Sequence, residues 1–515
     1  MTYTQHISLI TTSQRSSRMS ENTDQASAPQ KLFPQIIPRA AHVMRNSDLT
    51  PNTLKVLQTL IKHNYKAYAV GGCVRDKLMG QTPKDFDVVT NATPDQIKAC
   101  FRNCRLIGRR FRLAHITFGR EIIEVATFRG HHDSADDDDN NSDIDNDSAE
   151  LALEASQSGV SSSEKNLEKQ PEIYTGNKPN AGKPRRRPDR FVESDKTSKL
   201  NESGQLIRDN IFGSIEEDAA RRDFTFNAMY FDVTDESILD FAEGIHSIEH
   251  GSIEMIGDSA LRFREDPVRM IRAVRFACKL NMRLPEDLGR SIIKHAHLLA
   301  NIPPARLFEE VNKLLLSGYG LITFESLLKY KLLAQLFPLL TPLLSDKGSK
   351  EYQFVTAMLN NTDKRINNDM RITPAFLYAA FLWYPMEERA QALMFESSMQ
   401  MHDAMNLASA EVLFQQSRRI LVPKRFSMPV RDIWGLQQRL LKRQGKRCLT
   451  LLSHPKFRAA YDFMLLRGQV EGGDLLEAAQ WWTSFQEADL PLRTKMISSL
   501  PNQGPRRKRK RKPKA

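Results

Sequence analysis

The stretch "GGCVRDKLMGQTPKDFDVV", residues 71–89, combines two glycines, an arginine and two alternating aspartates. The apolar run Tyr68–Val70 before it predicts the end of a strand, and Gly71–Gly72 predicts a turn. About two helical turns follow to Gly80, and a second strand is expected from Phe86. β-Propensity alone would not place acidic residues on both sides of Phe86 at the start of an apolar strand. The order of strand, glycine turn, helix and acidic strand therefore predicts a functional unit.

The residue types in this unit suit phosphate and metal chemistry. Asp85 and Asp87 share one face of a strand, where two close carboxylates repel each other unless a cation lies between them. Mg²⁺ prefers carboxylate and phosphate oxygens, and two such ions can clamp the oxygens of a phosphoryl displacement. Gly71 and Gly72 leave backbone N–H groups open to a triphosphate at a helix start, and Arg75 can pair with phosphate oxygens.

Composition limits the classes of protein to which the chain can belong. A net charge of +12 and a pI near 9.3 over 515 residues favour a polyanionic partner such as nucleic acid, although a merely basic soluble protein is the alternative. The five cysteines are odd in number and scattered, which predicts no disulfides and a reducing, cytoplasmic location. No apolar run approaches the ~18 residues of a membrane helix.

The chain divides by composition into ordered and polar parts. Residues 131–205 contain "DSADDDDNNSDIDNDS" and "KPRRRPDR", too polar to bury a core, and predict a disordered insertion. From residue 258 onward, segments such as "DPVRMIRAVRFACKL" and "LITFESLLKYKLLAQLF" carry apolar residues at helical spacing. An α+β fold is therefore expected, with a head containing a small mixed sheet and a mostly α-helical body.

Several segments together resemble one enzyme superfamily. The stretches "VGGCVRD" and "KDFDVVTNATPDQI" resemble motif A of the nucleotidyltransferases that include tRNA CCA-adding enzymes and bacterial poly(A) polymerases. In order, "REIIEVATFRG" resembles the next core strand, "EEDAARRDFTFNAMYFD" motif B, "DFAEGIHSIEHGSI" motif C, "REDPVRMIRAVRFACKLNMRL" motif D and "PPARLFEEVNKLLLSGYG" motif E. Motif C departs from the family at Glu243, where a glycine is usual. The resemblance covers residues 35–130 and 206–480.

The resemblance implies the roles of individual residues. Asp85, Asp87 and Asp223 form its acidic catalytic triad, and Glu124 competes with Asp223 for the third position. Two Mg²⁺ ions are expected on Asp85, Asp87 and Glu124, with ATP as the substrate. The implied nucleotide-binding residues are Gly71, Gly72, Arg75, Asp76, Arg221, Arg222, Asn227, Glu265, Asp266, Arg269 and Arg272. The plain alternative for Asp223 is a structural salt bridge with an arginine.

Motif D has a physical interpretation of its own. Glu265, Arg269 and Arg272 are spaced i, i+4 and i+7, which predicts one face of a helix. Asp266 and Arg269 could offer an acceptor and a donor to a base edge, and in the family such a pair selects the incoming nucleotide. Without the other motifs, an intrahelical ion pair would be the ordinary interpretation.

Three segments and the basic tail favour the poly(A) branch of the superfamily over the CCA-adding branch. The segments that resemble poly(A) members are "FRNCRLIGRRFRLAHITFG", motif E and "RDIWGLQQRLLKRQGKRCLTLLSHPKFRAAYDFMLLR". The basic tail suits binding of RNA without sequence preference. The expected RNA-binding residues are Arg109, Arg110, Arg112, Arg506, Arg507, Lys508, Arg509, Lys510 and Arg511. A CCA-adding enzyme and a catalytically inactive RNA-binding relative remain the alternatives.

The expected activity is template-independent transfer of AMP from ATP to RNA 3′ ends, which would promote RNA turnover with RNA-decay proteins as partners. The expected organisation has five parts. These are a disordered leader (1–34), a nucleotidyltransferase head (35–250) with the insertion at 131–205, a helical nucleotide-selecting and RNA-binding neck (251–320), a helical RNA-binding body (321–490) and a basic tail (491–515).

Overall fold

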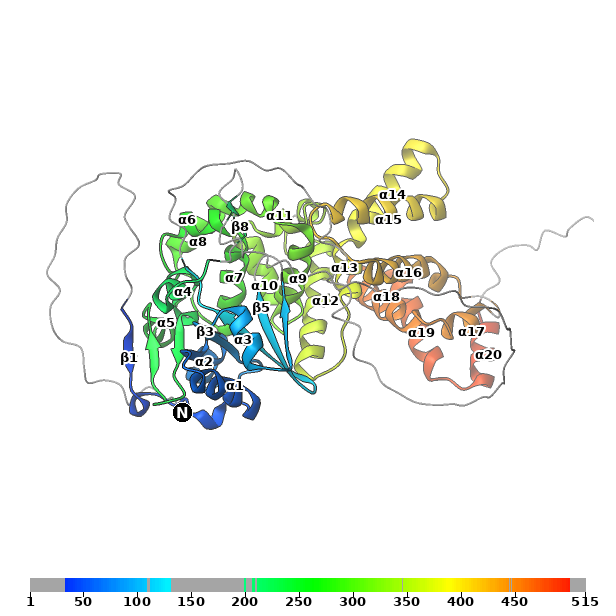
Figure 1. Ribbon diagram of the computed structural model, residues 1–515. Helices are drawn as coiled ribbons and strands as arrows, with labels where there is room; N and C mark the ends of the chain where they lie inside the picture. Colours follow the sequence, from blue (N-terminus) through cyan, green and yellow to red (C-terminus); the bar gives the residue numbers. More distant parts are fainter. Residues whose placement is uncertain are drawn as a thin grey trace, which may run out of the picture.

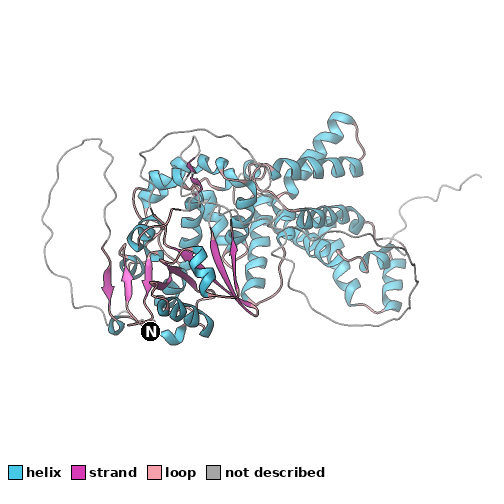
Figure 2. Cartoon of the chain, in the orientation of Figure 1, coloured by secondary structure: helices cyan, strands magenta, loops and turns pink. Residues whose placement is uncertain are grey.

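A mixed β-sheet at one end and helices over the rest of the molecule make up the fold, as a computed structural model shows (Figures 1 and 2). The structure describes residues 33–108, 112–130, 199–200, 206–208, 211–344, 346–443, 445 and 447–500. The predicted order of an α+β head followed by a helical body is confirmed. The predicted leader, the basic tail and almost all of the predicted insertion lie outside the described residues.

The head is built on eight strands in the order β1-β10-β9-β2-β3-β6-β5-β4. Only β3 and β6 run parallel, and the other neighbours are antiparallel. The strands are β1 (Gln35–Ile37), β2 (Ala67–Val70), β3 (Asp87–Thr90), β4 (Cys104–Ile107), β5 (Leu113–Phe118), β6 (Glu121–Thr127), β9 (Met229–Phe231) and β10 (Ile238–Asp240). A separate pair, β7 (Lys199–Leu200) and β8 (Leu206–Arg208), falls at the end of the predicted insertion.

Most of the other described residues form helices. Those of the head are α1 (Pro51–Lys62), α2 (Gly72–Leu78), α3 (Pro94–Cys100), α4 (Ile215–Arg221) and α5 (Gly244–Glu249). Next come α6 (Ser259–Glu265), α7 (Val268–Leu280), α8 (Glu286–His295), α9 (Pro304–Leu315), α10 (Gly320–Lys329), α11 (Leu333–Leu336) and α12 (Lys350–Asn367). The last are α13 (Pro374–Phe381), α14 (Trp383–Ser397), α15 (Met401–Ser417), α16 (Lys424–Leu441), α17 (Arg447–Leu452), α18 (Phe457–Glu471), α19 (Gly473–Glu487) and α20 (Leu490–Ser498).

Both faces of the sheet are covered, which fixes its position against the helices. Alternate residues of β3 enter different cores, because Val88 packs in the largest core and Val89 in a smaller one. The larger core also holds Phe276 of α7, so head and neck share apolar packing. The smaller core takes Ile215 from α4, which brings that helix to the face of the sheet that carries Asp87.

Helix boundaries follow local chemistry. The Oγ1 of Thr50 accepts a hydrogen bond from the N–H of Thr53, and Pro51 occupies the first turn of α1, where its missing N–H costs nothing. Ser214 caps α4 in the same way by accepting from the N–H of Glu217. The capped α4 leads directly into Arg221, Arg222 and Asp223.

The helical body extends away from the head. In Figure 1, α14 and α15 form a projecting hairpin, and α16–α20 lie at the end opposite the sheet. Among the described residues, no helix combines the length and the apolar composition that crossing a membrane requires. All five cysteines are described and free of disulfide bonds, as predicted.

Candidate active site

The turn after β2 places backbone against the segment that follows α4. Gly71 adopts φ +73° and ψ −118°, a conformation that only glycine adopts easily. A Cβ there would lie 3.4 Å from Arg222 Nη1 and 3.6 Å from the carbonyl oxygen of Asn227. The Gly71 N–H donates to the Met229 carbonyl at 3.2 Å, so this group is not open to a triphosphate as predicted. The predicted glycine turn is therefore in contact with the segment that carries Arg222 and Asn227.

The two predicted catalytic aspartates flank a buried ring. Phe86 is buried and both Asp85 and Asp87 are exposed, which agrees with a shared face for the carboxylates. The strand itself begins at Asp87, one residue later than predicted, so Asp85 lies in the loop before β3. Both carboxylates thus stand at the start of a central strand.

Glu124 joins these aspartates from the neighbouring strand. Val88 of β3 is paired with Val125 of β6, so Asp87 and Glu124 occupy adjacent positions one residue earlier. Although Asp87 is exposed as a residue, partial burial of its carboxylate and the charges of Glu124 and Asp85 raise its pKa, while Arg222 opposes the shift. His115 Nε2 lies 3.4 Å from Glu124 Oε1. Glu124 and Asp85 therefore both act electrostatically on Asp87.

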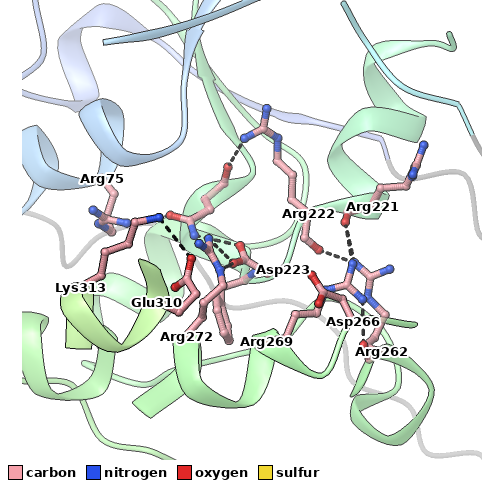
Figure 3. Close-up of polar contacts among 12 residues, drawn as sticks. Arg75, Arg221, Arg222, Asp223, Arg262, Asp266, Arg269, Arg272, Glu310 and Lys313 are labelled. Carbon is pink, nitrogen blue, oxygen red and sulfur yellow. Dashed lines mark hydrogen bonds and ion pairs between the residues drawn. The ribbon is translucent and has the colours of Figure 1, made fainter. Parts of the chain in front are cut away.

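Asp223 has a different environment. Its Oδ2 accepts from Arg272 Nε at 2.7 Å, and its Oδ1 accepts from Asn227 Nδ2 and from the Phe224 N–H, both at 2.9 Å. Burial opposes its ionisation, but Arg272 and these hydrogen bonds lower the pKa of Asp223 to about 2. Figure 3 shows Asp223 and Arg272 facing each other. This salt bridge is the alternative interpretation of Asp223, and Glu124 lies beside Asp87 on the neighbouring strand. Which of the two completes the acidic triad stays a prediction.

Arg222 is fixed beneath the glycine turn. Its Nε donates to the hydroxyl of Tyr230 at 2.9 Å and its Nη2 to Asp218 at 3.0 Å, while Nη1 donates to the Asn227 carbonyl at 3.2 Å. Burial by itself would lower the pKa of Arg222, but Tyr230 and Asp218 raise it above its ordinary value. The guanidinium is therefore a permanent positive charge close to Asp87.

Arg75 is a buried side chain that contacts other residues of the site. It is 3% exposed, and its guanidinium lies 5.1 Å from the centre of the Phe276 ring. Its Nη1 donates to Asn227 Oδ1 and its Nε to Asp76 Oδ1, both at 2.8 Å. These contacts favour a structural role for Arg75 over the predicted pairing with phosphate. Asp76 likewise faces Arg75, so both predicted nucleotide-binding residues have protein partners.

The motif D helix is broken, in contrast to the single helical face predicted for Glu265, Arg269 and Arg272. Helix α6 ends at Glu265 and α7 begins at Val268, because Pro267 has no N–H to donate and disfavours helical backbone at Asp266. The Glu265 Oε2 still accepts from Arg269 Nη1 at 2.7 Å and from Arg262 Nη1 at 2.8 Å. The ion pair therefore joins two helices.

A cavity of about 230 Å³ lies between these elements and α9. Its wall combines guanidinium groups, carboxylates and one aliphatic side chain: Arg221, Asp223, Asp266, Val268, Arg269, Arg272, Arg306 and Glu310. Asp266 Oδ2 accepts from Arg306 Nη2 at 2.7 Å. Five of the predicted nucleotide-binding or catalytic residues thus meet in one cavity.

Sequence reasoning missed Arg262, Arg306 and Glu310. Arg262 donates from Nη2 to the carbonyls of Arg221 and Arg222 at 2.7 and 2.6 Å, which ties α6 to the end of α4. Arg306 and Glu310 are spaced i, i+4 within motif E, and this spacing was the available signal. Of the predicted RNA-binding residues, Arg112 is exposed, and Arg109, Arg110 and the tail residues 506–511 lie outside the described residues.

Comparison with known proteins identifies the family. Three family models match the chain: "Poly A polymerase head domain" (67–254), "Probable RNA and SrmB- binding site of polymerase A" (281–344) and "Polymerase A arginine-rich C-terminus" (397–515). The poly(A) polymerase I of Salmonella typhimurium is 46% identical over 480 residues, which cover 92% of this chain and 91% of that protein. The chain belongs to the poly(A) polymerase I family.

The poly(A) polymerase I family is one branch of the nucleotidyltransferases. The chain is accordingly an enzyme, a polynucleotide adenylyltransferase. The CCA-adding enzyme of Bacillus pumilus is a more distant relative, 29% identical over 55% of this chain and 54% of that one. A solved Thermotoga maritima CCA-adding enzyme complexed with tRNA shares the fold, with a TM-score of 0.50, 17% identity and coverage of 86% and 84% of the two chains.

Proposed function

We propose that this poly(A) polymerase transfers AMP from ATP to the 3′-hydroxyl of RNA, without a template and with release of pyrophosphate, at the site where Asp85 and Asp87 adjoin the Gly71 turn. The observation that carries the proposal is the similarity of nearly the whole chain to a poly(A) polymerase I. The exposed carboxylates at the start of β3 supply the matching chemistry.

Mg²⁺ fits the donor set of this site. No three metal-binding side chains converge as a complete ligand set within the described residues. Mg²⁺ does not require such a set, because it keeps several waters and binds through one or two carboxylates together with substrate phosphates. Asp85 and Asp87, with Glu124 beside them, would hold two such ions, which supply Lewis-acid activation and charge neutralisation.

The protein's own groups would orient the nucleotide. Arg222 carries a permanent positive charge next to the Gly71 turn, which would attract the triphosphate. The cavity walled by Asp223, Asp266 and Arg269 would take the base. Asp223 is then a positioning residue rather than part of the acidic triad.

The setting of the reaction is also proposed. Five free cysteines agree with a reducing compartment, so we place the enzyme in the cytoplasm. One matched family description names an RNA and SrmB-binding site, and partners from RNA decay would fit an enzyme that modifies 3′ ends.

The test is extension of a generic RNA with each nucleoside triphosphate offered separately in Mg²⁺ buffer. The wild-type chain should add many residues from ATP alone. Asp87→Asn should lose at least about 10³-fold in rate, a loss of several kcal/mol, because a metal ligand is removed. Asp95→Asn, at an exposed aspartate of α3, is the matched control and should behave like the wild type. Addition of C, C and A to a trimmed tRNA, with a generic RNA left unextended, would contradict the proposal.

A further inference from the structure

Glu310 presents a buried carboxylate oxygen to the cavity. The side chain extends from α9, the residue is 7% exposed, and it lines the cavity wall. Its Oε1 accepts from Lys313 Nζ at 3.2 Å, whereas its Oε2 is buried without a hydrogen-bond partner. Figure 3 shows Glu310 close to Arg272 and Lys313. A buried acceptor left without a donor is costly, so this oxygen is a candidate for a ligand contact.

The other carboxylates of the cavity have protein donors. Asp223 accepts from Arg272 and Asn227, and Asp266 accepts from Arg306 and from the Val268 N–H at 3.2 Å. Of the polar side-chain atoms that line this cavity, all within the described residues, Glu310 Oε2 is the one that is buried and unpaired. A donor for this oxygen would therefore come from a molecule in the cavity rather than from these side chains.

The chemistry of this oxygen restricts what it can bind. Glu310 forms an ion pair with Lys313, and a carboxylate in an ion pair accepts hydrogen bonds and donates none. A phosphate oxygen is also an acceptor and would be repelled. The ligand atom must therefore carry a proton on nitrogen or oxygen, and adenine presents such a proton on its exocyclic amino group.

We propose that Glu310 Oε2 accepts a hydrogen bond from the amino group of the incoming adenine and so helps to determine nucleotide specificity. This inference rests on the proposed function, which places the base in the cavity. Guanine and uracil carry a carbonyl oxygen where adenine and cytosine carry the amino group, so an ionised carboxylate rejects the first pair. Glu310 of α9 would thereby contact the base in addition to the predicted pair, Asp266 and Arg269. The side chains of that pair already have protein partners.

The test compares ATP with purine riboside triphosphate, which lacks the 6-amino group, by measuring kcat/KM for extension of one RNA. The wild type should prefer ATP by at least about tenfold. Glu310→Met removes the acceptor and should bring the ratio close to one. Glu310→Gln keeps an acceptor oxygen and should retain an intermediate ratio, which guards against failure of the methionine variant to fold. Glu309→Gln, at the exposed neighbour on α9, should keep the wild-type ratio.

Three results would overturn the inference. An equal loss with ATP and the analogue in both Glu310 variants would show that Glu310 serves only the packing of α9. Loss of discrimination against 2′-deoxyATP, with the purine riboside ratio unchanged, would assign the oxygen to the ribose instead. A wild-type chain that does not use ATP would contradict the proposed function itself, whereas normal use of ATP with unaltered ratios in the variants would reject only the role of Glu310.

Discussion

Two aspartates of this chain are shifted in opposite directions by their surroundings. The pKa of Asp87 is raised by burial and by the negative charges of Glu124 and Asp85, whereas Arg272 and neighbouring donors hold the pKa of Asp223 at about 2. A bound cation would therefore stabilise the ionised form of Asp87, whereas Asp223 is already paired with Arg272. The sequence showed both residues as acidic members of motifs, but only the fold reveals which of them is neutralised by the protein.

Asp223→Asn should lower the free energy of unfolding by an amount that depends on pH. The folded pKa lies below the unfolded value near 3.9, so the stabilisation by Asp223 is complete above pH 4 and is lost as pH falls towards 2. The side chain is 11% exposed, and the lowering of its pKa from 3.8 to about 2 corresponds to about 2–3 kcal/mol. Urea unfolding should show the variant to be less stable by about that amount at pH 7. The difference should narrow below pH 4, and a difference that is independent of pH would contradict the assignment.

Elements, rather than single residues, bring the motifs together. The strands and helices of motifs A, B, D and E were predictable from apolar periodicity and glycine position, and Pro267 was a visible signal for the break between α6 and α7. The approach of α9 to that break was not predictable, because the contact between Arg306 and Asp266 joins residues forty positions apart. Periodicity describes one element at a time and does not identify the partner of an element.

The two ends of α2 offer a matched pair of variants. Gly71 before the helix and Gly80 after it both have φ +73°, but a Cβ at Gly71 would lie in contact with Arg222 Nη1 at 3.4 Å, whereas nothing lies within 4 Å of one at Gly80. Alanine at either position should destabilise the fold by about 1–2 kcal/mol through backbone strain. Only Gly71→Ala should also lower kcat/KM for ATP, because its methyl group would lie against Arg222 at the proposed triphosphate site. Equal kinetic losses in both variants, measured alongside melting temperatures, would show that strain alone is responsible.

At the scale of the whole molecule, the two ends of the long polar segment meet beside the sheet. The Gly130 N–H donates to the Ile211 carbonyl and the Gly213 N–H to the Phe128 carbonyl, both at 3.0 Å. A Cβ on Gly213 would collide with the backbone of Gly130. The chain thus leaves and re-enters the head at one point, which supports the prediction that residues 131–205 are an insertion.

Deletion of residues 133–203 should therefore leave the enzyme folded and active on a short RNA. The melting temperature should change by only a few degrees, because the hydrogen bonds between the two ends are kept. Gly213→Val is the contrasting variant and should destabilise the head by more than the deletion does, since it separates the two ends. Insoluble protein after deletion, or loss of ATP-dependent extension, would show that the segment is required by the catalytic head.

The meeting of residues 130 and 211 also bears on how the family can vary. Holding the two ends of an inserted segment together costs chain entropy. For a segment without structure of its own, this cost grows only with the logarithm of the number of residues between the ends. Each doubling of length adds about 0.6 kcal/mol, which is less than the effect of a typical single substitution. Selection on folding stability is therefore nearly indifferent to the length of sequence carried at this point. Length and charge there are free to be set by other demands, such as contact with RNA or with other proteins.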